Sequence, residues 1–128
     1  MQILAITEDN YLLNSLCDSR IAELGEVKLY KGSFDPLEVI SSVHSISPSL
    51  LILDDDILKP NSAKILKSIK QISKNVRIIF LTSNDSLDLG REISPIGVYF
   101  YGIKPISKAE ILTLIKSVST KNKSTTYS

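Results

Sequence analysis

Five short apolar segments recur along the 128-residue chain, and each is followed by a longer segment. They cover residues 3–6, 27–30, 50–53, 76–81 and 98–101. Most of the longer segments have the apolar spacing of an amphipathic helix. Strands that alternate with helices predict a parallel sheet with helices on both faces. The pattern therefore predicts one doubly wound, three-layer α/β domain.

The apolar segments differ in how their side chains alternate. Residues 50–53 are continuously apolar, which is typical of a central strand covered on both faces. Residues 26–30 alternate between polar and apolar side chains, which is typical of an edge strand with one wetter face. The second strand is therefore predicted at an edge of the sheet.

Polar residues mark the predicted helix starts. The candidate capping residues are Asn10, Asp35, Asn61 and Ser107. Glu38 and Glu110 stand three residues after two of them and complete capping boxes. Gly25 is expected to end the first helix. The fourth helix, residues 84–93, is the weakest, because Gly90 costs it about 1 kcal/mol relative to Ala.

Composition narrows the class of protein. Fifteen basic residues nearly balance 14 acidic ones, so the net charge of +1 gives no basic excess for direct nucleic-acid binding. No run approaches the ~18 apolar residues of a membrane span and no signal-peptide pattern is present, which favours a cytoplasmic protein. The single cysteine, Cys17, has no internal disulfide partner, and its apolar neighbours predict a buried, inert thiol.

Residues able to do chemistry follow four of the predicted strands. In an open parallel sheet, sites form beyond the carboxyl ends of the strands. The residues at those ends are Thr7, Glu8 and Asp9, then Asp54, Asp55 and Asp56, then Thr82, Ser83 and Asn84, and finally Lys104 and Pro105. Clustered carboxylates with no nearby His or Cys favour Mg²⁺ over zinc. A lysine and a hydroxyl beside a carboxylate suit phosphoryl transfer to that carboxylate.

Three segments carry a family resemblance. Residues 48–54, PSLLILD, resemble the response-regulator receiver signature, in which a proline leads into an apolar strand that ends at the phosphoacceptor aspartate. Residues 79–83, IFLTS, are similar to that family's fourth strand with its hydroxyl residue. Residues 101–105, YGIKP, match its fifth strand, where an aromatic residue precedes Lys-Pro. The motifs follow receiver order and spacing over nearly the whole chain.

The resemblance implies a flavodoxin-like receiver fold with five parallel strands in the order 2-1-3-4-5. It implies that Asp54 is the phosphoacceptor and that Lys104 and Thr82 contact the phosphoryl group. Tyr101 would be the aromatic switch residue that follows Thr82. The peptide bond between Lys104 and Pro105 would be cis.

The acidic residues after the first strand depart from the family pattern. Receivers have two acids directly after that strand, whereas the aligned residues here are Thr7 and Glu8, with Asp9 one position later. The resemblance implies an Mg²⁺ held by Glu8, Asp54 and Asp56, the last through its backbone carbonyl. A slipped turn would bring Asp9 into the same metal site.

The loop after the third strand is a second departure. The family's proline comes four residues after the acceptor, whereas Pro60 lies six residues after Asp54 and four after Asp56. Either the loop has two extra residues, or Asp56 is the acceptor. Asp54 is preferred because it follows the apolar run directly and its spacing to Pro48 and Thr82 fits receivers better.

Two functions follow from the resemblance. The first is a phosphorelay switch that is not an enzyme beyond its own phosphorylation and hydrolysis: a histidine kinase or phosphotransfer protein phosphorylates Asp54. The face formed by the fourth helix, fifth strand and fifth helix then changes shape to bind a downstream effector or a second copy of the chain. The second function is a pseudo-receiver, a protein-binding module that works without phosphorylation; Thr7 and the altered loop favour it.

A third class is a small flavodoxin-like binding domain or a metal-dependent phosphatase. The first strand is not followed by a Gly-rich phosphate loop, which disfavours a bound flavin phosphate. The receiver domain is expected to span residues 1–121. Residues 122–128 are polar and are expected to form a tail or the start of a linker.

Overall fold

The computed structural model describes residues 1–124, which form a sheet of five parallel strands. The strands are β1 (Gln2–Ile6), β2 (Glu26–Leu29), β3 (Leu50–Asp54), β4 (Arg77–Thr82) and β5 (Phe100–Ile103). Their order is β2-β1-β3-β4-β5, and each neighbouring pair is parallel. The predicted fold class and strand order are therefore confirmed.

Burial along the strands follows their place in the sheet. Every residue of β3 is buried, as expected for a central strand. β2 alternates between exposed and half-buried residues and forms one edge, as predicted. β5 begins two residues later than the apolar segment at 98–101; Val98 and Tyr99 pack against the cores, and the Tyr99 amide donates to the Ile78 carbonyl at 2.8 Å.

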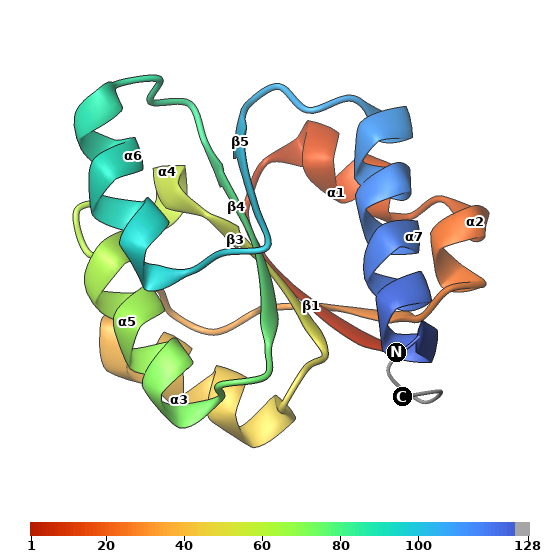
Figure 1. Ribbon diagram of the computed structural model, residues 1–128, viewed down its shortest axis with the longest axis horizontal. Coiled ribbons are helices and arrows are strands. Elements are labelled where there is room, and N and C mark those ends of the chain that lie inside the picture. Colours follow the sequence, from red (N-terminus) through yellow and green to blue (C-terminus); the bar gives the residue numbers. More distant parts are fainter. Residues whose placement is uncertain (125–128) are drawn as a thin grey trace.

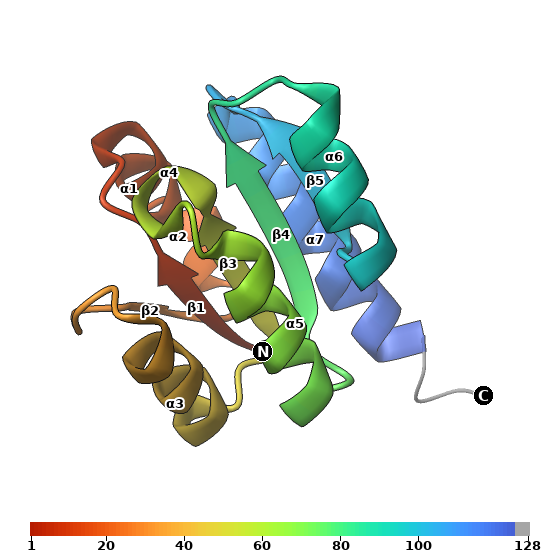
Figure 2. The same cartoon turned by 90° about the vertical axis from the view of Figure 1, so that its left-hand side faces the viewer.

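Helices cover both faces of the sheet (Figures 1 and 2). One layer contains α1 (Asn10–Leu16), α2 (Ser19–Ala22) and α7 (Lys108–Ser124). The other contains α3 (Pro36–Ile46), α4 (Asp55–Leu58), α5 (Ser62–Ile72) and α6 (Leu87–Ile93), and the 3-10 helix η1 (Ser94–Ile96) follows α6. Within residues 1–124, no helix is long and apolar enough to cross a lipid bilayer.

The last helix extends past the expected domain end at residue 121. α7 continues to Ser124, so the first part of the expected polar tail is helical. The rest of that tail, residues 125–128, lies outside the described residues.

Each face of the sheet has its own apolar core. Ile52 and Leu81 belong to the core under α1, α2 and α7, whereas Leu53 and Phe80 belong to the core under α3, α5 and α6. Successive side chains of a strand point to opposite faces. Adjacent residues at the end of β3 are therefore directed to different sides of the sheet, and this arrangement determines the geometry of the site.

The first helical segment is broken, contrary to the prediction of one helix ending at Gly25. α1 ends at Leu16, and Asp18 starts α2 by accepting a hydrogen bond from the Arg20 amide at 2.8 Å. Cys17 lies at the break and is exposed, so the prediction of a buried thiol was wrong. The Asp18 carboxylate competes for backbone N–H groups, an effect that apolar periodicity does not register.

The capping predictions are confirmed in part. The amide of Glu110 donates to the Ser107 hydroxyl oxygen at 3.1 Å, as predicted for the start of α7. At α3, Asp35 makes no side-chain cap, and Glu38 accepts hydrogen bonds from Ser33 instead. The predicted capping box at α3 was therefore wrong.

Candidate functional site

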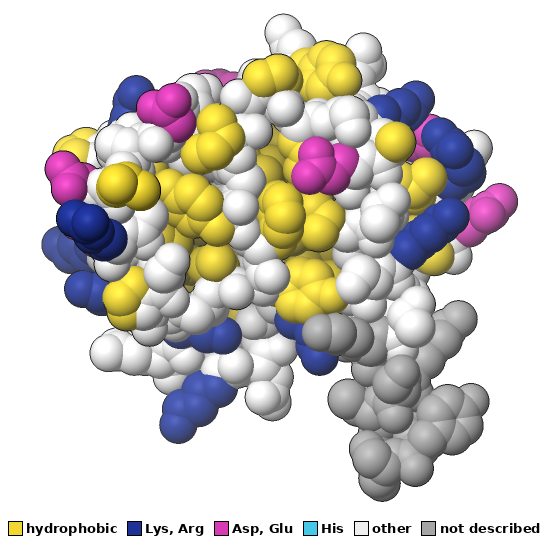
Figure 3. Space-filling view, turned by 45° about the horizontal axis from the view of Figure 1, so that its top comes forward, with side chains coloured by type: hydrophobic (Ala, Val, Ile, Leu, Met, Phe, Trp, Pro, Cys, Tyr) yellow, Lys and Arg dark blue, Asp and Glu magenta, His cyan; other side chains and the backbone are white. Residues whose placement is uncertain are grey.

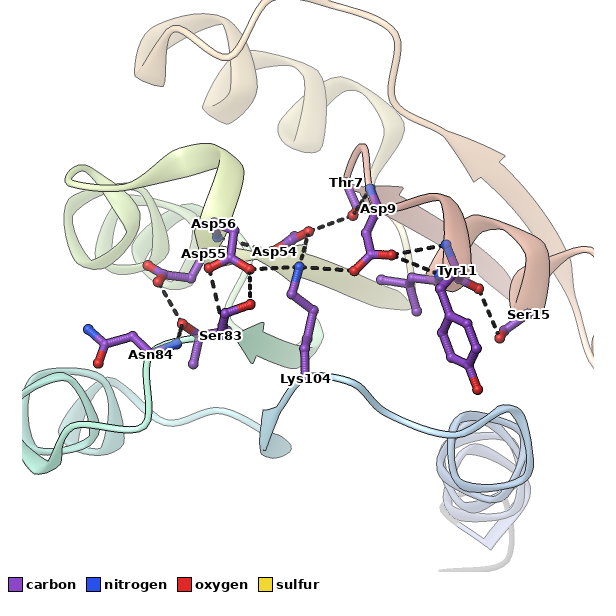
Figure 4. Close-up of polar contacts among 12 residues, drawn as sticks. Thr7, Asp9, Tyr11, Ser15, Asp54, Asp55, Asp56, Ser83, Asn84 and Lys104 are labelled. Carbon is purple, nitrogen blue, oxygen red and sulfur yellow. Dashed lines mark hydrogen bonds and ion pairs between the residues drawn. The ribbon is translucent and has the colours of Figure 1, made fainter.

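Polar side chains from four strands meet at one end of the sheet (Figure 4). β1 leads to Asp9, β3 ends at Asp54, β4 leads to Ser83 and β5 leads to Lys104. The carboxyl ends of parallel strands share one edge of the sheet, which brings these residues together. The predicted convergence of the strand ends is present.

Lys104 is the centre of this cluster. Its ammonium lies 3.0 Å from Oδ2 of Asp54, 3.1 Å from Oδ2 of Asp9 and 2.8 Å from Oδ2 of Asp56. Its side chain is 9% exposed, so the three ion pairs are only weakly screened by water. The peptide bond from Lys104 to Pro105 is cis, as predicted. We call Asp9, Asp54, Asp56 and Lys104 the acidic pocket.

Asp54 is held on both of its carboxylate oxygens. Oδ2 accepts a hydrogen bond from the Thr7 hydroxyl at 2.6 Å in addition to the contact with Lys104. Oδ1 accepts from the Asp56 amide at 3.0 Å, so Asp54 also caps α4. The residue is 2% exposed and has one fixed orientation at the end of β3. In the sequence, Thr7 was notable only because it stands where receivers have an acidic residue. In the structure, it is a direct hydrogen-bond partner of Asp54.

Asp9 joins the acidic pocket, whereas Glu8 does not. Oδ1 of Asp9 accepts hydrogen bonds from the amides of Tyr11 and Leu12, so Asp9 and not the predicted Asn10 caps α1. Oδ2 of the same carboxylate contacts Lys104. Glu8 is exposed, and within residues 1–124 no hydrogen bond or ion pair joins it to the pocket carboxylates.

Asp56 lies at the rim of the pocket and is held by Ser83. The Ser83 hydroxyl donates to Oδ2 at 2.6 Å, and the Ser83 amide donates to Oδ1 at 3.2 Å. From the sequence, Ser83 was placed after the fourth predicted strand but was assigned no role. Its strand-end position was the one available signal for this contact.

Thr82 and Tyr101 lie on the other side of the sheet from Asp54. The Thr82 hydroxyl donates to Oδ2 of Asp55 at 2.8 Å. Tyr101 is paired with Phe80 in the β4–β5 ladder, and the two rings stack with centroids 5.4 Å apart. The structure thus brings Lys104 to Asp54 but directs Thr82 to Asp55, a residue for which the sequence suggested no function.

The ion pairs set the ionisation of the pocket. Burial alone would lower the pKa of Lys104, but hydrogen bonds to Asp56 and Asp54 raise it above its ordinary value. Burial alone would raise the pKa of Asp9, yet the Leu12 amide and Lys104 lower it. The pKa of Asp56 is lowered in the same way by Lys104 and Ser83, against the effect of burial. Asp9, Asp56 and Lys104 are therefore ionised near neutral pH.

A surface pocket borders the acidic pocket. Glu8, Asp9, Asp54, Asp56, Ile57 and Lys104 line a surface pocket of about 350 Å³. The donor atoms are oxygens, which suit a hard divalent cation. Within residues 1–124, however, no three acidic, His or Cys side chains are arranged to hold a metal ion, because Lys104 occupies the point where the carboxylates converge.

The fold is that of response-regulator receiver domains. Similar solved structures include a response regulator from Thermotoga maritima, with 14% identity, a TM-score of 0.74 and coverage of 93% of this chain and 97% of that chain. An orphan response regulator of H. pylori has 16% identity, a TM-score of 0.75 and coverage of 93% and 96%. A receiver domain protein from Clostridium thermocellum has 23% identity, a TM-score of 0.71 and coverage of 95% and 96%. At these identities, the similarity shows the fold.

A curated relative adds similarity in sequence. The chain is 31% identical over 80 residues to sporulation initiation phosphotransferase F of Bacillus subtilis (strain 168), which is 62% of this chain and 64% of that protein. The match thus spans less than two thirds of the relative. No protein-family model matches the chain. The recognition of a receiver domain from the three motifs is confirmed by the fold and by this relative.

Proposed function

We propose that this receiver accepts a phosphoryl group on Asp54 from a histidine kinase or phosphotransfer protein in the cytoplasm. The observation that supports this most is the 3.0 Å contact between Oδ2 of Asp54 and the Lys104 ammonium at the end of a buried strand. Oδ2 would attack the phosphorus, forming an acyl phosphate as the bond to the donor nitrogen breaks. Lys104 would neutralise charge on the transferred oxygens.

Asp54 is a better candidate than Asp56 by position. Asp54 ends β3, where Thr7 and the Asp56 amide fix its two oxygens. Asp56 lies in the short helix α4 and is 26% exposed. A nucleophile already held in one orientation loses less entropy on reaching in-line geometry, which favours Asp54.

Mg²⁺ is part of this proposal. Lys104 would have to move from the point where the carboxylates converge before Mg²⁺ could bind there. Asp9, Asp54 and Asp56 would then supply oxygen atoms, including the backbone carbonyl of Asp56, and Glu8 would serve through its side chain at the pocket rim. A bound Mg²⁺ would add positive charge beside the phosphoryl oxygens. Lys104 already supplies part of that charge, so we expect weak binding of the metal.

A phosphorylation assay tests the proposal. The protein is incubated with acetyl phosphate, with and without Mg²⁺, and its intact mass is measured beside Asp54→Asn and Asp56→Asn. We expect one phosphoryl adduct in the wild type and in Asp56→Asn, and none in Asp54→Asn. An adduct that disappears only in Asp56→Asn would move the acceptor to Asp56.

The proposed output face consists of α6, β5 and α7. Figure 3 shows a side of the molecule on which hydrophobic side chains gather across the middle and most Lys and Arg side chains lie near the margin. Leu87 of α6 and Ile103 of β5 are 74% and 44% exposed, so this face offers apolar surface to an effector or to a second copy of the chain.

The alternative function is a phosphorylation-independent pseudo-receiver. The observation that favours it is that each of the six carboxylate oxygens of Asp9, Asp54 and Asp56 already accepts a hydrogen bond or ion pair within the protein. Absence of any adduct in the mass assay, together with no heat of Mg²⁺ binding by calorimetry, would select this function.

A further inference from the structure

Asp55 is a buried carboxylate outside the acidic pocket. It is 3% exposed and starts α4, directly after the proposed acceptor. Its Oδ1 accepts a hydrogen bond from the Ser62 hydroxyl at 2.6 Å, and its Oδ2 accepts from the Thr82 hydroxyl at 2.8 Å. Both of these donors are themselves buried, so the stability of this carboxylate depends on hydroxyl protons.

The Thr82 hydroxyl is fully engaged by this arrangement. A hydroxyl has one proton to donate, and that of Thr82 goes to Asp55. The same oxygen accepts a hydrogen bond from the Asn84 amide at 2.9 Å. Thr82 is completely buried. It could donate to a phosphoryl group on Asp54 only by leaving Asp55, which would strand a buried carboxylate oxygen.

A second hydroxyl lies on the same side of the sheet. Tyr101 is paired with Phe80, whose side chain points to the same face as that of Thr82 two residues later. The Tyr101 hydroxyl is buried and, within the described part of the chain, has no hydrogen-bond partner. Burial and the negative charge of Asp55 raise the pKa of Tyr101, so the phenol keeps its proton.

We propose that Asp55 is a positioning residue that exchanges one hydroxyl donor for another. Thr82 donates to it in the resting domain, and Tyr101 takes over when Thr82 turns toward a phosphoryl oxygen on Asp54. The Asp55 oxygen that loses Thr82 thereby gains a hydrogen bond from the Tyr101 hydroxyl, which has no partner in the resting domain. That Thr82 and Tyr101 are alternative donors to Asp55 is argued from contacts alone. That phosphorylation of Asp54 drives the exchange rests on the proposed function.

An unfolding experiment tests the exchange without phosphorylation. Thr82→Val, Tyr101→Phe and the double variant are unfolded in urea. Tyr101→Phe alone should change the unfolding constant little, because the hydroxyl it removes has no partner. In Thr82→Val, Tyr101 replaces the lost donor. The double variant loses both donors, so its unfolding constant should exceed the product of the single effects by about tenfold.

The matched control repeats this cycle in an Asp55→Leu background. Leu is close to Asp55 in shape and has no acceptor atom, so the coupling between positions 82 and 101 should vanish there. Single effects that simply multiply in the wild-type background would overturn the exchange. Coupling that persists with Leu at position 55 would also overturn it, because Asp55 would not be the shared acceptor.

A phosphorylation experiment tests the second half. With acetyl phosphate, Asp55→Asn should form the Asp54 adduct about three- to tenfold faster, because Thr82 no longer has to leave a carboxylate. Removal of a negative charge near the pocket could raise the rate by itself, so the variant is also made with Thr82→Val. The gain should disappear there; a gain that persists reflects charge alone and overturns the role of Thr82. A wild type that gives no adduct refutes the proposed function, while the unfolding cycle still decides the exchange.

Discussion

At Lys104, one ammonium faces three carboxylates. Counting Lys104 as +1 and Asp9, Asp54 and Asp56 as −1 each gives the acidic pocket a formal charge of −2. The ammonium is the one positive group at the centre of this cluster (Figure 4). Its loss would leave three partly buried carboxylates to repel one another, which makes Lys104 a structural as well as a functional residue.

Lys104→Met should destabilise the domain by about 2 kcal/mol at pH 7, less than for a fully buried pair because Asp9 and Asp56 are partly exposed. The difference should depend on pH. Contacts with Lys104 help to hold the pKa of Asp9 and Asp56 below 3.8, so their stabilisation is present above that pH and lost as pH falls below it. The raised pKa of Lys104 adds stability below pH 10.5 that is lost at higher pH.

Urea unfolding of both proteins between pH 3 and 11 measures this difference. We expect the difference in unfolding free energy between the two proteins to be constant near neutral pH and to become smaller towards both ends of this range. Lys108→Met is the matched control, because Lys108 pairs with Asp18 and its side chain is 52% exposed. A similar loss in both variants, independent of pH, would show that the ion pairs of the acidic pocket contribute little.

The residues of the site were only partly predictable. The spacing of the three motifs placed Asp54 and Lys104 correctly, because strand ends in a parallel sheet must meet. The choice of hydrogen-bond partners was not predictable. Whether Thr82 donates to Asp54 or to Asp55 depends on which face of the sheet each of these two carboxylates is directed to at the end of β3. Three consecutive Asp residues in the sequence carry no signal that distinguishes the two.

Among the elements, α6 has one buried anchor, Ile93. Ile93 is fully buried, but Leu87 at its start is 74% exposed. Gly90 lies in its middle, where an added Cβ would meet nothing within 4 Å. The helix therefore has little side-chain packing at its start, and Gly90 adds no side chain to its middle.

Gly90→Ala should stabilise the domain by about 0.5–1 kcal/mol, because alanine restricts the unfolded chain without a clash in the helix. Gly25→Ala is the contrasting control, since its Cβ would lie 2.4 Å from the Met1 carbonyl oxygen. We expect that variant to lose about 1–3 kcal/mol. Urea midpoints measure both changes, and equal signs for the two variants would contradict the packing described here.

Prediction at the level of elements succeeded where burial decides and failed where local polar contacts decide. The continuously apolar β3 and the alternating β2 were identified because their patterns reflect their places in the sheet. The break after α1 was missed because Asp18 captures backbone amides locally. The predicted start of β5 was two residues early, although the Tyr99 amide already donates to the Ile78 carbonyl of β4 at 2.8 Å.

For the whole molecule, one sheet is shared by two cores. Leu66 of α5 packs on one face and Ile115 of α7 on the other, and both are fully buried. Each of the three central strands contributes side chains to both cores. Neither layer can lose its packing without exposing the sheet that supports the other, so the two layers should unfold together.

Substitutions in the two layers should therefore affect a single transition. Ile65→Val in α5 and Ile115→Val in α7 should each cost about 1 kcal/mol, and their costs should add within about 0.5 kcal/mol. Circular dichroism and tyrosine fluorescence should report the same urea midpoint for each variant. Two separate transitions in either variant would show that the layers are independent.

The two edges of the sheet differ in how they meet other proteins at high concentration. β2 presents the exposed charges of Glu26 and Lys28, which discourage an approaching strand, whereas none of the four residues of β5 is charged. We therefore expect any strand addition by a second copy of the chain at β5 and not at β2. That strand also carries Tyr101 and leads into Lys104, so pairing at this edge would place a second chain beside residues of the proposed switch.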